Sequence, residues 1–212
     1  MRIAVIGTGS VGRALGGRFA EIGHEIVFGS RSPSSGRVET LLAEIGHGVR
    51  AETPSDAAAT AEVVVLAVPW SVAADAVAAL GDLEDRILVD CTNPLLAGAA
   101  GLDIRGGVSG AERLRERTRG GRLVKAFNTT GAGNMADADY GDRRLSMPLC
   151  GDDRDARDRV ARLARDIGFE PLDCGPLSAA ILLEHLALLW IRLAYDEGLG
   201  PRFGFALLRR EA

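Results

Sequence analysis

The chain has 212 residues, of which 47% are hydrophobic, and its formal net charge at pH 7 is -4. This length suits one α/β domain with a small appendage, and the apolar content is enough for a complete core. The weakly negative charge argues against broad binding to nucleic acid or to an acidic membrane surface. The cysteines Cys91, Cys150 and Cys174 form no C-x-x-C pair, so neither a disulfide framework nor a metal site is expected.

Short apolar runs alternate with Ala-rich segments of helical periodicity along most of the chain. The runs predict strands over residues 2–6, 25–28, 48–51, 63–68, 86–90, 123–127, 146–150 and 170–173. The periodic segments predict helices over residues 11–22, 38–45, 71–80 and 156–167. Alternating β and α units predict an α/β fold with a doubly wound, mostly parallel Rossmann sheet.

The first predicted strand is followed by a glycine motif that opens the first predicted helix. Its residues are Gly7, Thr8, Gly9, Ser10, Val11 and Gly12, in the pattern G-x-G-x-x-G. In this context the first glycine permits a tight turn, the second admits a pyrophosphate and the third lets the helix pack closely. The N–H groups at the start of the helix then face the phosphates. The motif therefore predicts dinucleotide binding, with an ordinary glycine-rich turn as the alternative.

The second predicted strand ends at residue 28, and Gly29, Ser30, Arg31 and Ser32 follow. Enzymes specific for NAD usually place a carboxylate here to hold the ribose 2′-hydroxyl. Hydroxyl and guanidinium groups instead suit a 2′-phosphate, which a carboxylate would repel. Arg37 is a candidate for a second clamp on that phosphate. These residues predict NADP as the cofactor, with a solvated surface charge as the alternative for each arginine.

Three later segments follow predicted strands at the same carboxyl edge of the sheet, where ligands bind in open α/β sheets. In the first, Val68 and Pro69 end a strand and Trp70 is expected near the dinucleotide, with packing at the sheet edge as the alternative. In the other two, Asn93 and Asn128 can hold a carboxamide or a polar ring edge, with simple turn chemistry as the alternative.

The chain after residue 175 has a different pattern. A long helix is expected to about residue 196, and its polar residues Ser178, His185 and Arg192 form one narrow stripe. The remaining circumference is apolar, so the helix should be buried nearly all round, and a second subunit is expected to cover it. We therefore expect a Rossmann domain over 1–175, a dimerisation segment over 176–212 and a homodimer. The apolar stretch 179–194 is short for a membrane span and no signal peptide is recognised, so a cytoplasmic protein without a membrane partner is expected.

The sequence offers no strong general base, no Tyr-x-x-x-Lys pair and no metal-ligand cluster. His24, His47 and His185 are all expected to be structural or solvated, so no residue is predicted to be catalytic. Reduction of a carbonyl normally needs a proton donor, whereas hydride exchange between two redox rings needs only stacking and desolvation. The absence therefore favours a reaction between two small redox cofactors.

These motifs together resemble the coenzyme F420-dependent NADP oxidoreductase family over essentially the full length. The shared segments are GTGSVG, GHEIVFGSR, AVPW, VKAFNT, LCGDD and DCGPLSAA. The resemblance implies direct hydride transfer between NADP(H) and the deazaflavin ring of F420. It also implies a set of NADP contacts, which are Thr8, Gly9, Ser10, Val11, Ser30, Arg31 and Trp70. Related NADPH domains in membrane ferric reductases pass the hydride to a flavin.

We therefore predict an NADPH-dependent F420 reductase. The main alternative is an NADPH-dependent flavin or ferric reductase with the same fold. Imine or small-carbonyl reduction is weakened by the missing proton donor. A non-catalytic NADP-binding sensor is the remaining alternative, and turnover with any acceptor would exclude it.

Overall fold

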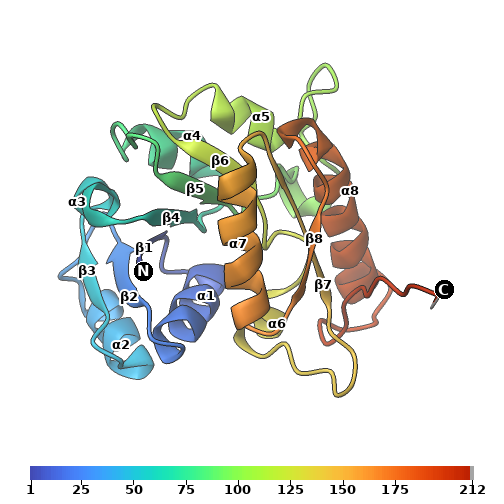
Figure 1. The fold of residues 1–212 in the computed structure, drawn as a ribbon, viewed down its shortest axis with the longest axis horizontal. Coiled ribbons are helices and arrows are strands. Elements are labelled where there is room, and N and C mark those ends of the chain that lie inside the picture. The colour runs from blue at the N-terminus through green and yellow to red at the C-terminus, as the bar shows by residue number, and fades with distance from the viewer. Residues whose placement is uncertain (211–212) are drawn as a thin grey trace.

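The computed structural model describes residues 1–210 and contains one eight-stranded sheet with helices on both faces (Figure 1). The strand order is β3-β2-β1-β4-β5-β6-β7-β8. The strands are β1 (Arg2–Ile6), β2 (Glu25–Gly29), β3 (Arg50–Glu52), β4 (Val63–Leu66), β5 (Ile87–Asp90), β6 (Arg122–Lys125), β7 (Ser146–Gly151) and β8 (Glu170–Asp173). Every neighbouring pair is parallel except β6 and β7. The predicted mostly parallel Rossmann-type sheet is confirmed.

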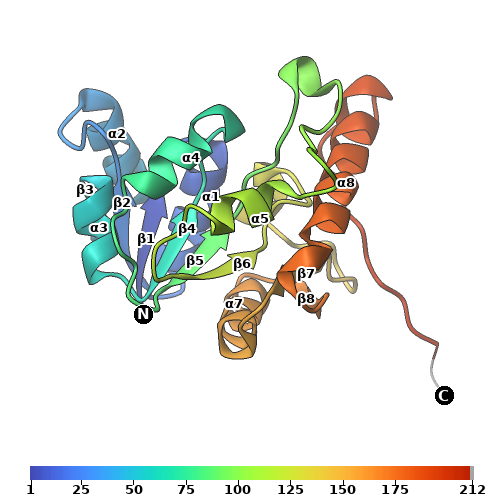
Figure 2. The same cartoon turned by 90° about the horizontal axis from the view of Figure 1, so that it is seen from above.

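Eight α-helices flank the sheet within residues 1–210. They are α1 (Ser10–Glu21), α2 (Gly36–Ile45), α3 (Pro54–Thr60), α4 (Trp70–Ala78), α5 (Gly110–Arg115), α6 (Ala132–Ala136), α7 (Arg154–Asp166) and α8 (Ala180–Ile191). The sequence pattern missed α3, α5 and α6, because helices of five to seven residues are too short to show an apolar period. The last of the helices, α8, lies beside α5 (Figure 2).

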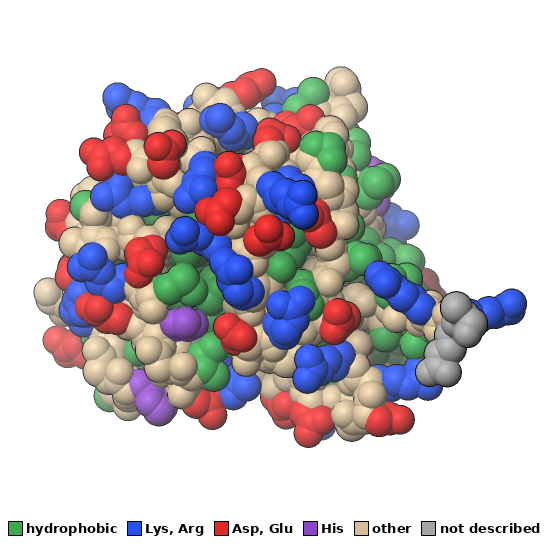
Figure 3. Space-filling model, viewed as in Figure 1, with side chains coloured by type: hydrophobic (Ala, Val, Ile, Leu, Met, Phe, Trp, Pro, Cys, Tyr) green, Lys and Arg blue, Asp and Glu red, His purple; other side chains and the backbone are tan. Residues whose placement is uncertain are grey.

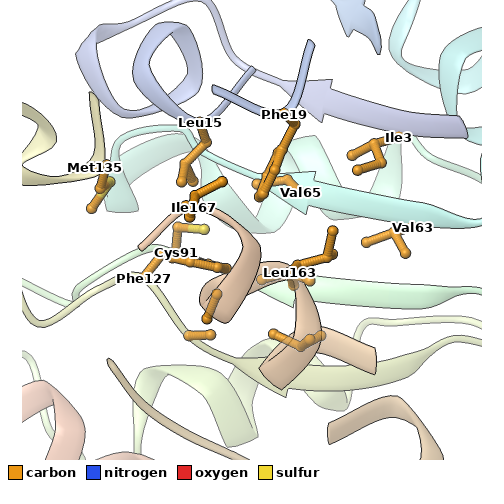
Figure 4. Close-up of a cluster of buried hydrophobic side chains, with 14 of the residues drawn as sticks. Ile3, Leu15, Phe19, Val63, Val65, Cys91, Phe127, Met135, Leu163 and Ile167 are labelled. Carbon is orange, nitrogen blue, oxygen red and sulfur yellow. The ribbon is translucent and has the colours of Figure 1, made fainter. Parts of the chain in front are cut away.

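The central strands are buried on both faces and divide the core into two layers. Side chains alternate along a strand, so in β1 Ile3 and Val5 face one layer while Ala4 and Ile6 face the other. In the first layer, Leu15 and Phe19 of α1 and Leu163 of α7 pack on the sheet (Figure 4). The second layer is covered by α3, α4, α5 and α8. This arrangement leaves the carboxyl ends of β1, β2 and β4 at one edge.

The C-terminal helix differs from its prediction in one way. It runs without a break over Leu177–Asp196, which by length and composition alone is enough to cross a membrane, a test that core helices of globular proteins also pass. The expectation that the stretch is too short was therefore wrong. Within one chain Leu182 is 67% exposed and Leu189 is 48% exposed, and their cover by a second subunit stays a prediction. Glu184, in contrast, is fully buried.

The surface viewed in Figure 3 carries acidic and basic side chains side by side. Several charged side chains of the molecule form ion pairs, as Arg122 does with Asp153 and Asp155, and Arg157 does with Asp173. Exposed pairs of this kind contribute little to stability, about 0–1 kcal/mol each. No continuous basic area covers this face of the molecule.

Candidate functional site

The glycine motif forms a tight turn between β1 and α1 that only glycine permits at two positions. Gly7 has a φ of 117°, and a Cβ placed on it would lie 2.2 Å from the carbonyl oxygen of Ala67. A Cβ on Gly12 would lie 2.1 Å from the carbonyl oxygen of Gly7. At Gly9, by contrast, a Cβ would meet no heavy atom within 4 Å, so the space beside this residue is open.

The first turn of α1 faces that open space without a side-chain cap. Gly9 is its N-cap, and no side chain accepts a hydrogen bond there within the described residues. The helices α3, α5 and α7 are instead capped by Thr53, Ser109 and Asp153. The first N–H groups of α1 thus keep their capacity to donate to an anion, and the helix dipole favours negative charge at this position.

A groove of about 490 Å³ extends from this turn along the carboxyl ends of β1, β2 and β4. Nine of the fifteen predicted site residues line it, namely Gly7, Thr8, Gly9, Ser30, Arg31, Ser32, Arg37, Val68 and Pro69. Ser10, Val11 and Gly12 are the first residues of α1, directly beside it. The sequence pattern missed the wall formed by Pro54 and by one side of α4, which comprises Val72, Asp75, Ala76 and Ala79. These residues belong to no sequence motif, and the sequence pattern indicates only that most of them lie in an Ala-rich helix.

The groove is positively charged where the second strand ends. Arg31 and Arg37 are exposed, and among residues 1–210 neither forms a salt bridge. The backbone N–H of Ser30 donates to the carbonyl oxygen of Glu52 at 2.9 Å, which holds the loop at the end of β2. Two unpaired guanidinium groups and two serine hydroxyls therefore face the same groove as the open end of α1.

Trp70 lies outside the lining of this groove and packs on α5 instead. The guanidinium carbon of Arg113 lies 5.0 Å from the centroid of the Trp70 ring, a cation–π arrangement. The ring also lies close to Gly110, where a Cβ would be 3.1 Å from the Trp70 Cη2 atom. The same Cβ would be 3.1 Å from Pro94. The tryptophan thus connects α4 to α5, and Pro94, the residue after Asn93, lies beside the same glycine.

Asn93 and Asn128 hydrogen-bond to each other at the carboxyl edge. The Nδ2 group of Asn93 donates to the backbone oxygen of Asn128 at 2.9 Å, and the Nδ2 group of Asn128 donates to Oδ1 of Asn93 at 2.9 Å. Asn128 also donates to the carbonyl oxygen of Leu183 in α8 at 3.3 Å. Its Oδ1 atom is buried and has no partner within the described residues. The two amides form one unit, and Asn93 is its half-exposed member.

A charged cluster that sequence reasoning missed lies beneath this pair. Asp90 ends β5, Lys125 ends β6 and Glu184 lies in α8, and all three side chains are fully buried. The Lys125 ammonium donates to Asp90 Oδ2 at 2.9 Å and lies 3.2 Å from Glu184 Oε1. Burial by itself would lower the pKa of Lys125, but the facing carboxylates outweigh it, so the pKa is raised and the group stays charged.

None of the three histidines lines the groove. His185 is exposed on α8, where its Nδ1 atom lies 2.7 Å from the carbonyl oxygen of Ile181. His47 is exposed in a loop, and His24 is half-buried beside the N-terminal amine. Among residues 1–210 no three His, Cys, Asp or Glu side chains are grouped so that they could hold a metal ion.

Comparison with known proteins places the chain in a family. A family model for coenzyme F420-dependent NADP oxidoreductases matches residues 2–94. The F420-dependent NADP reductase of Methanothermobacter thermautotrophicus is 35% identical over 214 residues, which cover 91% of this chain and 89% of that protein. This chain belongs to the F420-dependent NADP oxidoreductase family. The predicted family is confirmed.

Solved structures agree with membership of the F420-dependent NADP oxidoreductase family. A protein from Arthrobacter sp. FB24, described as a proposed F420-dependent NADP reductase, superposes with a TM-score of 0.89 at 32% identity and covers 99% of this chain. The rat metalloreductase STEAP3 is 29% identical over 88% of this chain, which spans only 36% of its length. A reductive aminase from Aspergillus terreus, at 17% identity and a TM-score of 0.67, shares the fold alone.

Proposed function

We propose that this member of the F420-dependent NADP oxidoreductase family transfers a hydride directly between NADP(H) and coenzyme F420. The observation that carries the proposal is the groove in which the uncapped start of α1 faces the unpaired Arg31 and Arg37. A dinucleotide with a 2′-phosphate supplies negative charge at both of these places. Coenzyme F420 is proposed as the other redox partner because the family is named for both NADP and F420.

Each part of the groove has a role in this proposal. The first-turn N–H groups of α1, from Gly9 to Gly12, hold the pyrophosphate, and Thr8 lies beside them. Ser30, Arg31 and Ser32, with Arg37 as a second clamp, hold the 2′-phosphate. Val68, Pro69 and α4 form the apolar wall on the other side. The open space beside Gly9 and the absence of a carboxylate after β2 fit such a ligand.

The acceptor side of the proposed site is built from the residues that follow β5 and β6. A nicotinamide ring supplies a hydride and a deazaflavin ring accepts it. The chain has to orient both rings and exclude water, and neither task needs a titrating side chain. Asn93 presents a fixed amide because both its polar atoms are held by Asn128. Trp70, held by α5, shields the neighbouring edge of the site.

A second candidate is the reduction by NADPH of a flavin, or of ferric iron by way of a flavin. The observation that favours it is the 29% identity to the metalloreductase STEAP3 over most of this chain. The NADP half of the site would be the same in either reaction. The two candidates therefore differ only in the acceptor.

Parallel assays of NADPH oxidation with F420, FMN, FAD and ferric iron separate the two. We expect F420 to give a kcat/KM at least about tenfold above that of any other acceptor. Turnover with FMN or FAD but not with F420 would favour the second candidate. Tight NADPH binding without turnover of any acceptor would leave only an NADP-binding sensor.

We also propose that α8 joins two copies of the chain into a homodimer. Within residues 1–210, the exposed side of α8 carries Leu182 and Leu189 between Ser178, His185 and Arg192. Two leucines seven residues apart on a helix face suit a two-fold contact with the same face of a second copy. In this proposal residues 1–175 form the NADP-binding domain and 176–212 the dimerisation segment, of which 211–212 lie outside the described residues.

The double variant Leu182→Glu/Leu189→Glu is expected to convert the dimer into a folded monomer. Both leucines are about half exposed or more in the single chain, so charging them should disturb association rather than the core. Light scattering at micromolar concentration gives the mass, and circular dichroism checks the fold. Ile22→Glu, at an exposed apolar residue outside the segment 176–212, is the control and should remain dimeric. An unchanged mass for the double variant would contradict the proposal.

The proposal further places the enzyme in the cytoplasm, with small redox cofactors as its partners and no membrane or nucleic acid. The support is the buried contact of Glu184 with Lys125, which ties the apolar helix to the sheet. A helix that crosses a membrane alone would leave that carboxylate without its partner, at a high energetic cost.

A further inference from the structure

Lys125 is the one lysine in a chain with 25 Lys and Arg residues in all. Its side chain is fully buried, and three oxygen atoms surround its ammonium group. These are Oδ2 of Asp90, the backbone oxygen of Thr92 and Oε1 of Glu184. The ammonium group donates to Asp90 and to the backbone oxygen of Thr92, and it forms an ion pair with Glu184. The planar, five-donor group of an arginine does not match this enclosed set.

The two carboxylates of the cluster have further donors that fix them in place. Asp90 Oδ1 accepts from the backbone N–H of Thr92 at 2.8 Å and from its hydroxyl at 2.7 Å. Glu184 accepts from the backbone N–H of Gly110 at 3.0 Å and of Ala111 at 3.1 Å, at the start of α5. Every charge in the cluster is thus satisfied without water, which is the condition under which buried charges persist.

The cluster reaches both sides of the proposed acceptor site. Through the backbone oxygen of Thr92, Lys125 holds the residue next to Asn93. Through Glu184 it holds the start of α5, the helix whose Arg113 lies over the Trp70 ring. One ammonium group therefore connects the end of β5, the end of β6, α8 and α5 at the carboxyl edge of the sheet.

We propose that Lys125 is a positioning residue for the acceptor half of the hydride-transfer site. It fixes the Asn93–Asn128 pair through Thr92, and Trp70 through Glu184 and α5, without touching either redox partner. The expected effect on F420 turnover rests on the proposed function. The expected effect on the Asn93–Asn128 pair rests on the geometry alone. The buried charges of Asp90, Lys125 and Glu184, called the anchor below, thus hold the acceptor side of the site and do not line the NADP groove.

The structural consequence is measurable without turnover, because the chain contains three asparagines: Asn93, Asn128 and Asn134. Protein labelled with ¹⁵N at asparagine gives one pair of side-chain amide signals for each. Lys125→Met is expected to shift or broaden the signals of Asn93 and Asn128. Asn134 donates to the backbone oxygen of Phe203 at 2.7 Å and to Thr130, away from the cluster, so its signals should remain unchanged.

Arg86→Met is the control for the loss of a partly buried basic group beside the same strand, β5. Arg86 precedes the opposite end of β5, where it donates to the backbone oxygens of Ala59, Ala61 and Leu83. Its removal should lower the melting temperature as well, yet leave all three asparagine signals in place. Equal disturbance by Arg86→Met and Lys125→Met would show a general structural effect and overturn the proposal.

The kinetic consequence separates positioning from stability. Lys125→Met should raise the KM for F420 at least about tenfold and change the NADPH dissociation constant less than about twofold. Lys125→Met leaves the carboxylates of Asp90 and Glu184 without their cation. Adding Glu184→Gln removes one of these two charges, so the double variant should melt at a higher temperature than Lys125→Met. Its KM for F420 should stay high, because Thr92 still lacks the ammonium group. Should Lys125→Met fail to fold, this double variant carries the same comparison.

Two results would contradict the inference. One is recovery of the F420 KM together with the melting temperature in the double variant. The other is unchanged Asn93 and Asn128 signals in folded Lys125→Met or in the double variant. Failure of the proposed function is distinguishable, because the parent protein would then not oxidise NADPH with F420, while the asparagine signals would still report on the anchor.

Discussion

Arg31→Ala should raise the NADPH dissociation constant about ten- to a hundredfold and leave NADH affinity nearly unchanged. A charge-assisted hydrogen bond contributes about 1.5–3 kcal/mol, which corresponds to this range of affinity. Only NADPH carries the 2′-phosphate that Arg31 is proposed to hold. The exposed Arg31 has no carboxylate partner within the described residues, so its loss should not destabilise the fold.

The measurement is a titration of each cofactor followed by fluorescence or calorimetry. Arg37→Ala should give a smaller loss in the same direction, since it is the second clamp. Arg154→Ala is a control, because Arg154 lies on α7, whose residues do not line the groove. An equal loss of NADPH and NADH affinity in Arg31→Ala would mean that Arg31 shapes the groove and does not bind the 2′-phosphate.

Replacing a glycine of α1 by alanine is expected to raise the stability of the protein at one position and to lower it at another. Gly17→Ala should stabilise the protein by up to about 1 kcal/mol, since alanine favours a helix and its Cβ would meet only Ile45, at 4.0 Å. Gly12→Ala should destabilise it, because its Cβ would lie 2.1 Å from the backbone oxygen of Gly7. Overpacking of this kind costs about 1–3 kcal/mol or more and outweighs the helix preference.

Thermal unfolding and NADPH titration of both variants give the test. For a domain of this size about 1 kcal/mol corresponds to roughly 2–4 °C in Tm, so the two variants should move apart measurably. Gly12→Ala should also weaken NADPH binding, because Gly7 must move to make room. Equal behaviour of the two variants would show that the glycine turn is not under the steric constraint described for it.

Much of the sheet was predictable because buried parallel strands are short apolar runs bounded by polar residues. The bounds of β1 and β8 match the prediction, and the others differ by a few residues. The groove was predictable for a similar reason, since the glycine turn and the residues after β2 follow their strands directly. Both features depend on residues that are neighbours in the sequence, so the sequence alone predicts them.

The anchor beneath the acceptor side was not predictable in that way. Asp90, Lys125 and Glu184 are far apart in the chain and meet only through the sheet order and the docking of α8. The direction of Trp70 depends on the same contacts, because α5 decides which side of the ring is covered. One signal was present in the sequence, since a chain rich in arginine retains a single lysine.

Direct hydride transfer is tested most directly with NADPH that carries deuterium at both C4 positions of the nicotinamide ring. In single turnover with F420 in ordinary water, we expect the deuterium in the reduced deazaflavin ring and none in the solvent. This follows from a site whose residues orient two rings and offer no titrating group for the hydride step. Loss of the deuterium to water, measured by mass spectrometry of the reduced F420, would contradict the account and favour a proton-coupled reaction.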